Sequence, residues 1–296
     1  MRWILGLDLR PLCAGAVRFA KWLAANSRAT DAERCVAVHA LEEQHLLAVL
    51  RYHHLQEVLD GARASAQAIL SAERASAEIA AIDVVQGTSV QEVLEAARVK
   101  YAASGTIIGR AAGVEGKGVV RLGRSARRVL RSATAPVIVV PPDLRLEDLG
   151  KGPVLALTSL RPDSVEACRF AAAIAGRLGR PWALLHVALV PEEFAPPYLP
   201  APSLEGMRRD FLADAEKALP AWIAAEGLRP DRSDVVQGRI VDSALAFARL
   251  HDAPLLVAGS QRLSALERAI VPSVGSELAA SAPVPVAVVP PAAEAA

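Results

Sequence analysis

The sequence predicts an α/β protein made of two tandem doubly wound domains, in each of which helices flank a parallel sheet. Three observations support this fold class. The chain repeats itself with a period near 150 residues, and each repeat alternates short apolar runs with helical patterns. The composition, with 52% apolar and 22% charged residues, is that of a globular protein. Strands that alternate with helices favour a parallel sheet with helices on both faces.

The repeat consists of segments that recur in the same order. Asp83–Gly87 returns as Asp234–Gly238, 151 residues later, and Pro136–Pro142 returns with one change as Pro285–Pro291, 149 residues later. A period of this length is the size of a whole domain and is too long for a solenoid unit. The chain therefore divides into three predicted segments: a first domain over residues 1–143, a linker over 144–152 and a second domain over 153–292.

In the first copy, apolar runs predict five strands, and helical periodicity predicts the helices between them. The predicted strands are Ile4–Leu7, Cys35–His39, Ile82–Gln86, Gly105–Ile108 and Val137–Val140. The predicted helices are one that starts near Pro11, a long one over Leu46–Ala80 with a break near Gly61, Val90–Tyr101 and Ser125–Ser132.

The second copy repeats this order. Its predicted strands are Val154–Leu157, Ala183–His186, Ser233–Gln237, Leu255–Ala258 and Val286–Val289, and its clearest helices are Leu204–Ala225 and Val241–Leu250. Right-handed crossovers leave an open doubly wound sheet as the best topology, and such sheets bind ligands at the carboxyl ends of their strands. The candidate site positions in the first copy are therefore Asp8, His39 and the loop that starts at Gly109.

Composition and charge exclude several classes of function. The chain holds 33 basic and 32 acidic residues, so no strong net charge attracts nucleic acid or an anionic membrane. The three cysteines have neither CxxC nor Cys/His metal-ligand spacing, and their odd number favours a reducing compartment. No apolar run approaches the 18 residues of a membrane span, and the first residues lack a secretory pattern. We expect a cytoplasmic protein.

A glycine-rich loop follows the fourth predicted strand of the first copy. Gly109 and Gly113 lie in this loop, and nine residues separate Gly113 from Gly123, which opens the next helix with Arg124 and Ser125. Small residues let backbone N–H groups approach phosphate oxygens, and a helix N-terminus adds unpaired donors and partial positive charge. The loop is not a Walker A motif, because Gly118 follows Lys117 where Ser or Thr is required. The pattern indicates an anion-binding loop.

The order of these motifs resembles the universal stress protein family, whose nucleotide-binding members carry G-x2-G-x9-G-(S/T) after the fourth strand. The resemblance covers both halves and implies, for each domain, a five-stranded parallel sheet of order 3-2-1-4-5. It implies that ATP or a related adenine nucleotide, with Mg²⁺ as an accompanying ion, lies across the carboxyl ends of the strands. The resemblance implies that Asp8 and the backbone near Val38 contact the adenosine part of the nucleotide. It implies that the ribose and phosphates are contacted by Gly109, Gly113, Gly123, Arg124 and Ser125.

This first-domain loop departs from the family pattern in two places. Three residues separate Gly109 from Gly113 where the pattern has two, and Arg124 stands where Ser or Thr is expected. The second domain departs further, because the repeat places Thr158 at the position of Asp8 and the loop after Gly259 has no glycine before Gly275. We therefore expect the second domain to be a degenerate structural partner.

The apolar fifth strands suggest how the domains associate. In a 3-2-1-4-5 sheet each fifth strand lies on an edge, and an exposed apolar edge is an aggregation hazard. Members of the family commonly cover it by pairing the fifth strands of two domains, which predicts an intramolecular pseudo-dimer. A homodimer and a regulatory protein partner are further expectations.

Several alternatives compete with nucleotide binding. The arginines around Arg124 fit a solvated helix face as well as a phosphate site, and His39 and His186 fit structural histidines that cap a strand better than catalytic ones. The protein is then either a stress-response protein that binds adenine nucleotide or a nucleotide-free scaffold that acts through protein contacts. No nucleophile with its base is present, so the sequence predicts at most slow ATP hydrolysis.

Overall fold

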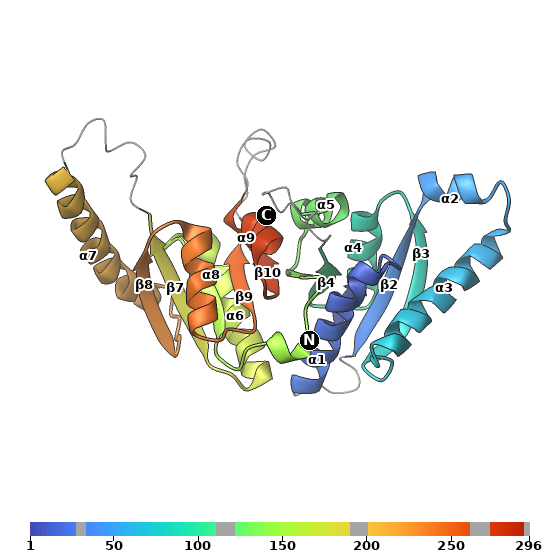
Figure 1. Ribbon diagram of the computed structural model, residues 1–296, viewed down its shortest axis with the longest axis horizontal. Helices are drawn as coiled ribbons and strands as arrows, with labels where there is room; N and C mark the ends of the chain where they lie inside the picture. The colour runs from blue at the N-terminus through green and yellow to red at the C-terminus, as the bar shows by residue number, and fades with distance from the viewer. Residues whose placement is uncertain (28–33, 111–121, 190–200, 261–272, 293–296) are drawn as a thin grey trace. The chain divides into compact units, whose positions relative to one another are not determined.

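The computed structural model describes residues 1–27, 34–110, 122–189, 201–260 and 273–292. The chain divides into two compact units (Figure 1). Unit 1 consists of Met1–Leu149 and Ser276–Val288, and unit 2 of Gly150–Gly275 and Val289–Ala296. The first boundary, between Leu149 and Gly150, falls inside the segment predicted as the linker. The repeat assigns residues 276–288 to the second copy, but their contacts group them with unit 1.

The first copy alternates strands and helices as predicted. Its elements are β1 (Trp3–Gly6), α1 (Ala14–Asn26), β2 (Cys35–Glu42), α2 (Glu43–Val49), α3 (Leu55–Ala72), β3 (Ile79–Gly87), α4 (Val90–Lys100), β4 (Gly105–Gly109), α5 (Arg124–Ser132) and β5 (Val137–Val140). The second copy follows with β6 (Val154–Thr158), α6 (Val165–Leu178), β7 (Trp182–Ala188), α7 (Ala201–Ala225), β8 (Arg232–Gln237), α8 (Ile240–Leu250), β9 (Leu256–Gly259), α9 (Val274–Ser281) and β10 (Val286–Val289).

The strand order confirms the predicted fold class. In unit 1 the strands lie in the order β3-β2-β1-β4-β5-β10, and in unit 2 in the order β9-β6-β7-β8. Strands β1 to β5 pair in parallel with their neighbours, as do β6 to β9. Unit 1 thus contains the predicted order 3-2-1-4-5, and unit 2 repeats the 3-2-1-4 part of it.

The two predicted fifth strands pair with each other inside unit 1. Strand β10 is antiparallel to β5, with Val286 opposite Val139 and Val288 opposite Val137. All residues of both strands are buried. Because each strand covers backbone groups that the other would otherwise expose, the pairing removes the aggregation hazard that an apolar edge presents.

Helices cover both faces of the unit 1 sheet (Figure 1). Helix α1 packs on β4 and β5 through fully buried residues such as Phe19, whereas α4 packs on β1 and β2 and contacts α5. An ion pair joins α1 to the end of α3: Arg18 Nε and Nη2 donate to the two carboxylate oxygens of Glu73 over 2.6 and 2.8 Å. A bidentate pair of this kind fixes geometry as well as adding energy.

Local signals set the ends of several helices. Helix α4 begins after Ser89, whose hydroxyl accepts a hydrogen bond from the backbone N–H of Glu92, and this is the usual role of a serine N-cap. Helix α6 ends at Gly179, whose φ of +63° suits glycine at a helix C-terminus.

The long helix predicted over Leu46–Ala80 is wrong, because the chain forms two helices and then enters β3. The break lies between Val49 and Leu55 and not near Gly61, which lies inside α3. Helix α3 begins after His54, whose backbone N–H donates to the Glu57 carboxylate over 3.2 Å. The link between α2 and α3 is exposed, so it carries no apolar periodicity from which the break could be predicted.

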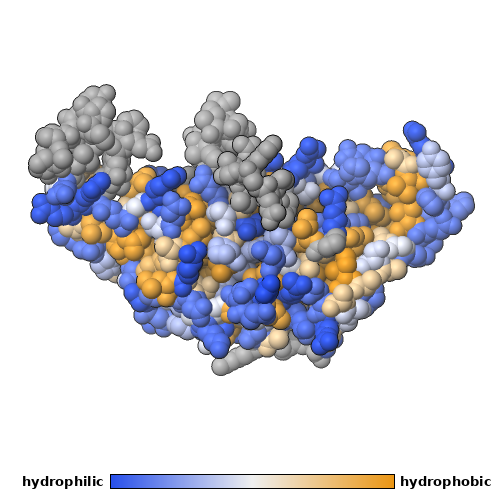
Figure 2. All heavy atoms as spheres, in the orientation of Figure 1, coloured by the Kyte–Doolittle hydropathy of each residue, from blue (hydrophilic) through white to orange (hydrophobic). Residues whose placement is uncertain are grey.

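The surface mixes polar and apolar residues, as Figure 2 shows for one face. Large exposed apolar side chains gather at α2 and the start of α3: Leu47, Val49, Tyr52 and Leu55. Within the described ranges, no helix is both long and apolar enough to span a membrane.

All three cysteines are buried and unpaired. Burial raises the pKa of Cys13 to about 11, with a further contribution from Asp8, and raises the pKa of Cys35 and of Cys168 to about 12. Only the thiolate reacts with a disulfide reagent. We therefore expect almost no labelling of the native protein by Ellman's reagent at pH 8 and rapid labelling of all three thiols in denaturant. Fast labelling of any one cysteine before unfolding would contradict this.

Candidate functional site

Three adjacent strands of unit 1 bring predicted site residues to one edge of the sheet. Gly6, the last residue of β1, lies opposite Val38 on β2 and opposite Ile108 on β4. The chain continues from these positions to Asp8, His39 and Gly109: β1 and β4 end at this level, whereas β2 continues beyond it to Glu42. The structure thus brings Asp8, Val38 and Gly109 together, at the topological switch point where such sheets bind ligands.

Asp8 lies in a tight turn that holds its carboxylate at the surface. Its Oδ1 accepts a hydrogen bond from the backbone N–H of Arg10 over 3.0 Å, and Leu9 between them has a φ of +57°. A non-glycine residue in the left-handed region indicates a turn that its surroundings hold in place. Because Asp8 is exposed, its carboxylate can accept hydrogen bonds from a ligand.

Val38 and His39 have structural roles inside β2, where β1 beside it ends. The Val38 side chain is buried, and its carbonyl accepts a hydrogen bond from the N–H of Leu7 over 2.9 Å. His39 Nδ1 lies 2.7 Å from the Leu7 carbonyl oxygen, and in the second copy His186 Nδ1 lies 2.9 Å from the Thr158 carbonyl oxygen. Both histidines are half-buried inside their strands and do not cap them, but each contacts the carbonyl oxygen at the end of the neighbouring strand, which is a structural role.

Gly109 permits a close approach of two backbone segments. A Cβ at Gly109 would lie 3.3 Å from the Leu12 carbonyl oxygen, and a Cβ at Gly259, its counterpart, would lie 2.9 Å from the Asp163 carbonyl oxygen. Because both copies need this close approach, packing alone accounts for the glycine. Its recurrence in the repeat is therefore no evidence of a ligand.

Arg110, which follows Gly109, is bound to the backbone of α9. Its Nη1 donates to the backbone carbonyls of Ala280 and Ala279 at the end of α9, both in unit 1. Burial lowers the pKa of the guanidinium, against the nearby charge of Asp143, and Nε is buried without a partner among the described residues. The carbonyl end of a helix is the end that favours a cation.

Helix α5 begins where the sequence predicts an anion-binding helix start. Gly123 precedes the helix, and its carbonyl accepts the first helical hydrogen bond from the Arg127 N–H. Arg124 and Ser125 form the first turn, and both are exposed. With no side chain on the N-cap residue, the first N–H groups of α5 are available to an anion. Gly113, also a predicted site residue, lies outside the described residues.

Glu42 lies near this helix, and sequence reasoning missed it because β2 is three residues longer than predicted. Its carboxylate is largely buried and lies 3.9 Å from Arg128 Nη1 and 3.5 Å from His45 Nδ1. Of the arginines on α5, Arg128 alone has a carboxylate within 4 Å in the part of the chain that the structure describes. The helix start therefore has an excess of positive charge.

The second copy corrects the sequence comparison at Asp8. Leu160 has the same left-handed conformation as Leu9, with a φ of +59°. The carbonyl of Thr158 contacts His186 as the carbonyl of Leu7 contacts His39, so Thr158 corresponds to Leu7. Ser159, and not Thr158, is therefore the counterpart of Asp8. The hydrogen bond that closes the turn is shifted by one residue between the copies. In the first copy the Asp8 carboxylate accepts from the Arg10 N–H, and in the second copy Thr158 Oγ1 accepts from the Leu160 N–H.

Hydrogen bonds within the second-copy turn already engage its polar groups. Ser159 Oγ donates to Asp163 over 3.0 Å and lies 2.8 Å from Ser164 Oγ, which also accepts from the Ser159 N–H. The conclusion that the charged acceptor is lost in the second copy therefore holds, although the residue that replaces it was misassigned.

The predicted equivalence of Gly275 with Gly123 is also wrong. Gly123 precedes α5, whereas Gly275 is the buried second residue of α9. The side chains of Ser132 and Ser281 bond to the carbonyls of Arg128 and Glu277, which aligns the two helices with an offset of 149. Matching Gly123 with Gly275 requires an offset of 152 residues, whereas the helices themselves align with an offset of 149. The two glycines are therefore not equivalent.

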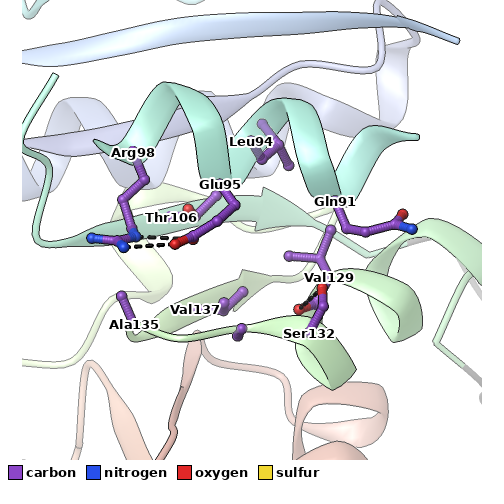
Figure 3. Close-up of a pocket in the computed structure, with 10 residues that line it drawn as sticks. Gln91, Leu94, Glu95, Arg98, Thr106, Val129, Ser132, Ala135 and Val137 are labelled. Atoms are coloured by element: carbon purple, nitrogen blue, oxygen red, sulfur yellow. Dashed lines mark hydrogen bonds and ion pairs between the residues drawn. The ribbon is translucent and has the colours of Figure 1, made fainter. Parts of the chain in front are cut away.

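A shallow hollow of about 270 Å³, which includes open solvent above it, lies between α4 and α5 (Figure 3). Leu94, Val129 and Val137 supply apolar lining. Glu95 and Arg98 lie on its rim: Arg98 donates to both Glu95 oxygens over 2.9 and 2.6 Å, and Thr134 donates to one of them over 2.7 Å. This hollow is separate from the edge formed by Asp8, Val38 and Gly109.

The Glu95 cluster predicts a dependence of stability on pH. Hydrogen bonds from Arg98 lower the pKa of the Glu95 carboxyl, against burial and with help from Thr134. A carboxyl with a lowered folded-state pKa adds stability above its unfolded-state pKa, about 4.3, and loses it as the pH falls through the folded-state value. Glu95→Gln should therefore reduce the free energy of unfolding at pH 7 more than at pH 3, as measured by urea denaturation. Glu216→Gln, at an exposed position of α7, is the control, and an equal effect of both changes would contradict the prediction.

The chemistry of the site is that of binding. Within the described ranges, no group of three or more His, Cys, Asp or Glu side chains could hold a metal ion. An exposed carboxylate, a helix N-terminus and unbalanced arginines can bind a ligand with hydroxyl and anionic groups.

Comparisons with known proteins agree with this fold. The model of the universal stress protein family matches residues 152–290. A universal stress protein from Archaeoglobus fulgidus DSM 4304 is 17% identical over 97% of this chain and 98% of its own, with a TM-score of 0.64. A putative universal stress protein from Pseudomonas aeruginosa UCBPP-PA14 is 14% identical over 98% of this chain and 94% of its own, with a TM-score of 0.60. No curated protein matches the chain.

Proposed function

We propose that this chain, whose residues 152–290 match the model of the universal stress protein family, is a cytoplasmic stress-response protein that binds ATP or a related adenine nucleotide in its first domain. The observation that carries the proposal is the edge of the unit 1 sheet. There an exposed carboxylate at Asp8 lies beside Val38 and Gly109 on neighbouring strands. The first turn of α5 supplies the positive charge.

The residues present fit the parts of a nucleotide. The Asp8 carboxylate has acceptor capacity beyond its bond to Arg10 and suits ribose hydroxyls. The backbone near Val38 supplies the place for the base. The first N–H groups of α5, the Arg124 guanidinium and the Ser125 hydroxyl suit the phosphates, and Gly109, Gly113 and Gly123 are the glycines that the family pattern assigns to the same part of the ligand. Mg²⁺, where it accompanies the nucleotide, would neutralise phosphate charge, and the phosphate oxygens would be its main ligands.

We assign the second domain a structural role. Its turn at Ser159 is engaged by Asp163 and Ser164, and no carboxylate stands in place of Asp8. The antiparallel pairing of β10 with β5 supports an intramolecular pseudo-dimer, since it uses the last strand of the second copy. Under this proposal the first domain binds the ligand and the second completes the fold. The domain limits 1–143 and 153–292 and a homodimer remain predictions.

Two measurements test nucleotide binding. Native mass spectrometry of gently purified protein should detect an adenine nucleotide, and calorimetric titration of nucleotide-free protein with Mg-ATP should give a dissociation constant below about 1 mM, that is, a binding free energy stronger than about −4 kcal/mol. If no nucleotide co-purifies and millimolar ATP produces no binding signal, the proposal is wrong.

The alternative is a nucleotide-free tandem scaffold that acts through protein contacts. The exposed apolar side chains of Leu47, Val49, Tyr52 and Leu55 favour it, because clustered apolar residues on a surface mark interaction sites. A scaffold would bind its partner equally well with and without ATP, and this separates the two functions.

A further inference from the structure

Helix α5 carries a row of four arginines along one side. Arg124, Arg127, Arg128 and Arg131 follow the spacing i, i+3, i+4 and i+7, which places them on one face of a helix. All four are exposed, whereas Ala126 and Val129 on the opposite face are buried. These four residues are called the arginine stripe below.

The arginine stripe lacks the acidic neighbours that usually balance such a face. Arg128 has Glu42 at 3.9 Å, and within the described residues no carboxylate lies within 4 Å of the other three guanidinium groups. Arg124 with Arg128, and Arg127 with Arg131, are like charges four residues apart, an arrangement that destabilises a helix. The stripe is therefore unfavourable for the isolated helix.

The fold does not require this charge. Helix α9, aligned with α5 through Ser132 and Ser281, occupies the same place in the second copy. At the positions of the stripe the second copy has Ser273, Ser276, Glu277 and Ala280. Because the second copy builds this helix with no arginine, the charge on α5 is explained by something other than packing.

A shallow hollow with a mixed polar and apolar lining adjoins the arginine stripe. Val129 and Ser132 of α5 form one wall of the hollow between α4 and α5, and Leu94 forms part of the other (Figure 3). Its volume of about 270 Å³ is mostly open solvent, so the hollow is a shallow depression that one side chain can contact and not an enclosed ligand site. Neither α5 nor the lining of the hollow contains an aromatic residue.

We propose that the arginine stripe and the adjoining hollow form a docking surface for an acidic segment of a partner protein. Carboxylates of that segment pair with the guanidinium groups, which bind carboxylates in bidentate fashion, and one aliphatic side chain enters the hollow. Charge complementarity identifies an anionic partner. The absence of aromatic residues from α5 and from the lining of the hollow favours a polypeptide over nucleic acid, because single-stranded nucleic acid binds by stacking its bases on aromatic side chains.

The test uses the full chain and a fluorescent 16-residue peptide that carries glutamates at the spacing i, i+3, i+4 and i+7 and one leucine. Fluorescence anisotropy should report binding that weakens as NaCl rises, because salt screens exposed charges. Arg127→Glu with Arg131→Glu should weaken binding at least about tenfold, since two exposed ion pairs are lost and the reversed charges add repulsion. Arg124 stays unchanged in this variant, which leaves the proposed nucleotide site intact.

The matched control reverses two exposed arginines on other helices, Arg63 on α3 and Arg209 on α7, and should leave peptide binding within about twofold, since neither guanidinium lies on the docking surface. Circular dichroism and thermal unfolding establish that both double variants fold, and Arg127→Ala with Arg131→Ala serves as a milder second pair. Ala135→Leu fills the hollow. It should weaken the binding of the leucine peptide more than the binding of a peptide in which alanine replaces that leucine.

Three results would overturn the proposal. The first is no binding of the glutamate peptide at low salt, and the second is an equal loss of binding in the stripe and control variants. The third is stronger binding by inorganic polyphosphate or a single-stranded oligonucleotide than by the peptide at equal charge, which would identify the stripe as a phosphate-binding surface. Stripe-specific loss with a preference for the peptide supports the proposal, whether or not ATP binds at Asp8.

Discussion

Gly15→Ala should destabilise unit 1 by at least about 3 kcal/mol, more than is typical of a single methyl group added to a packed interior. A Cβ at Gly15 would lie 1.9 Å from the Pro141 carbonyl oxygen and 3.0 Å from that of Pro142. Both contacts are with backbone, which a change of rotamer cannot relieve. The start of α1 and the chain that leaves β5 would therefore have to separate.

Gly61→Ala is the matched control, because it makes the same substitution at an exposed position of a helix. No atom lies within 4 Å of a Cβ built at Gly61, which lies inside α3. Alanine favours a helix over glycine, so this change should stabilise the protein by about 0.5–1 kcal/mol. Thermal unfolding should show Gly15→Ala lower by roughly 6–12 °C and Gly61→Ala slightly higher than the parent. An unchanged midpoint for Gly15→Ala would contradict the packing described here.

No pattern in the sequence marks Gly15. The repeat puts Glu166 at its position in the second copy, so comparison of the copies predicts that a side chain is tolerated there. The requirement arises from contact with Pro141 and Pro142, which are distant in sequence. The strands, in contrast, were predictable because buried parallel strands are continuous apolar runs, and β5 and β10 have the predicted bounds.

The candidate site was only partly predictable, for a related reason. Residues at the ends of strands follow from the strand assignment, so Asp8 and Gly109 were found from sequence, and Val38 of β2 lies beside the end of β1 at the same edge. Loops change the offset between the copies, and as a result Ser159 was missed in favour of Thr158 and Gly275 was wrongly matched to Gly123. Glu42 was missed because β2 continues beyond its apolar run. Hydrogen bonds and backbone angles located the true equivalents.

Asp8→Asn should weaken ATP binding by roughly tenfold to a hundredfold, since a hydrogen bond to a charged group contributes about 1.5–3 kcal/mol. Asparagine keeps an oxygen that can accept the Arg10 N–H, so the turn with its left-handed Leu9 should persist. The loss then reports the missing negative charge and not a damaged loop. Asp8→Ala removes the acceptor altogether and should abolish binding, at some cost to the turn.

The second copy supplies the control for this experiment. Ser159→Ala changes the structural counterpart of Asp8, and Thr158→Ala changes the neighbouring residue whose hydroxyl accepts from Leu160. Neither should alter ATP affinity, because the proposed site lies in the first domain. Calorimetric titration of all four variants, with thermal unfolding to verify folding, gives the comparison. A loss for Ser159→Ala as large as that for Asp8→Asn would move the nucleotide site to the second domain, whereas full affinity in Asp8→Asn would remove the Asp8 charge from the site.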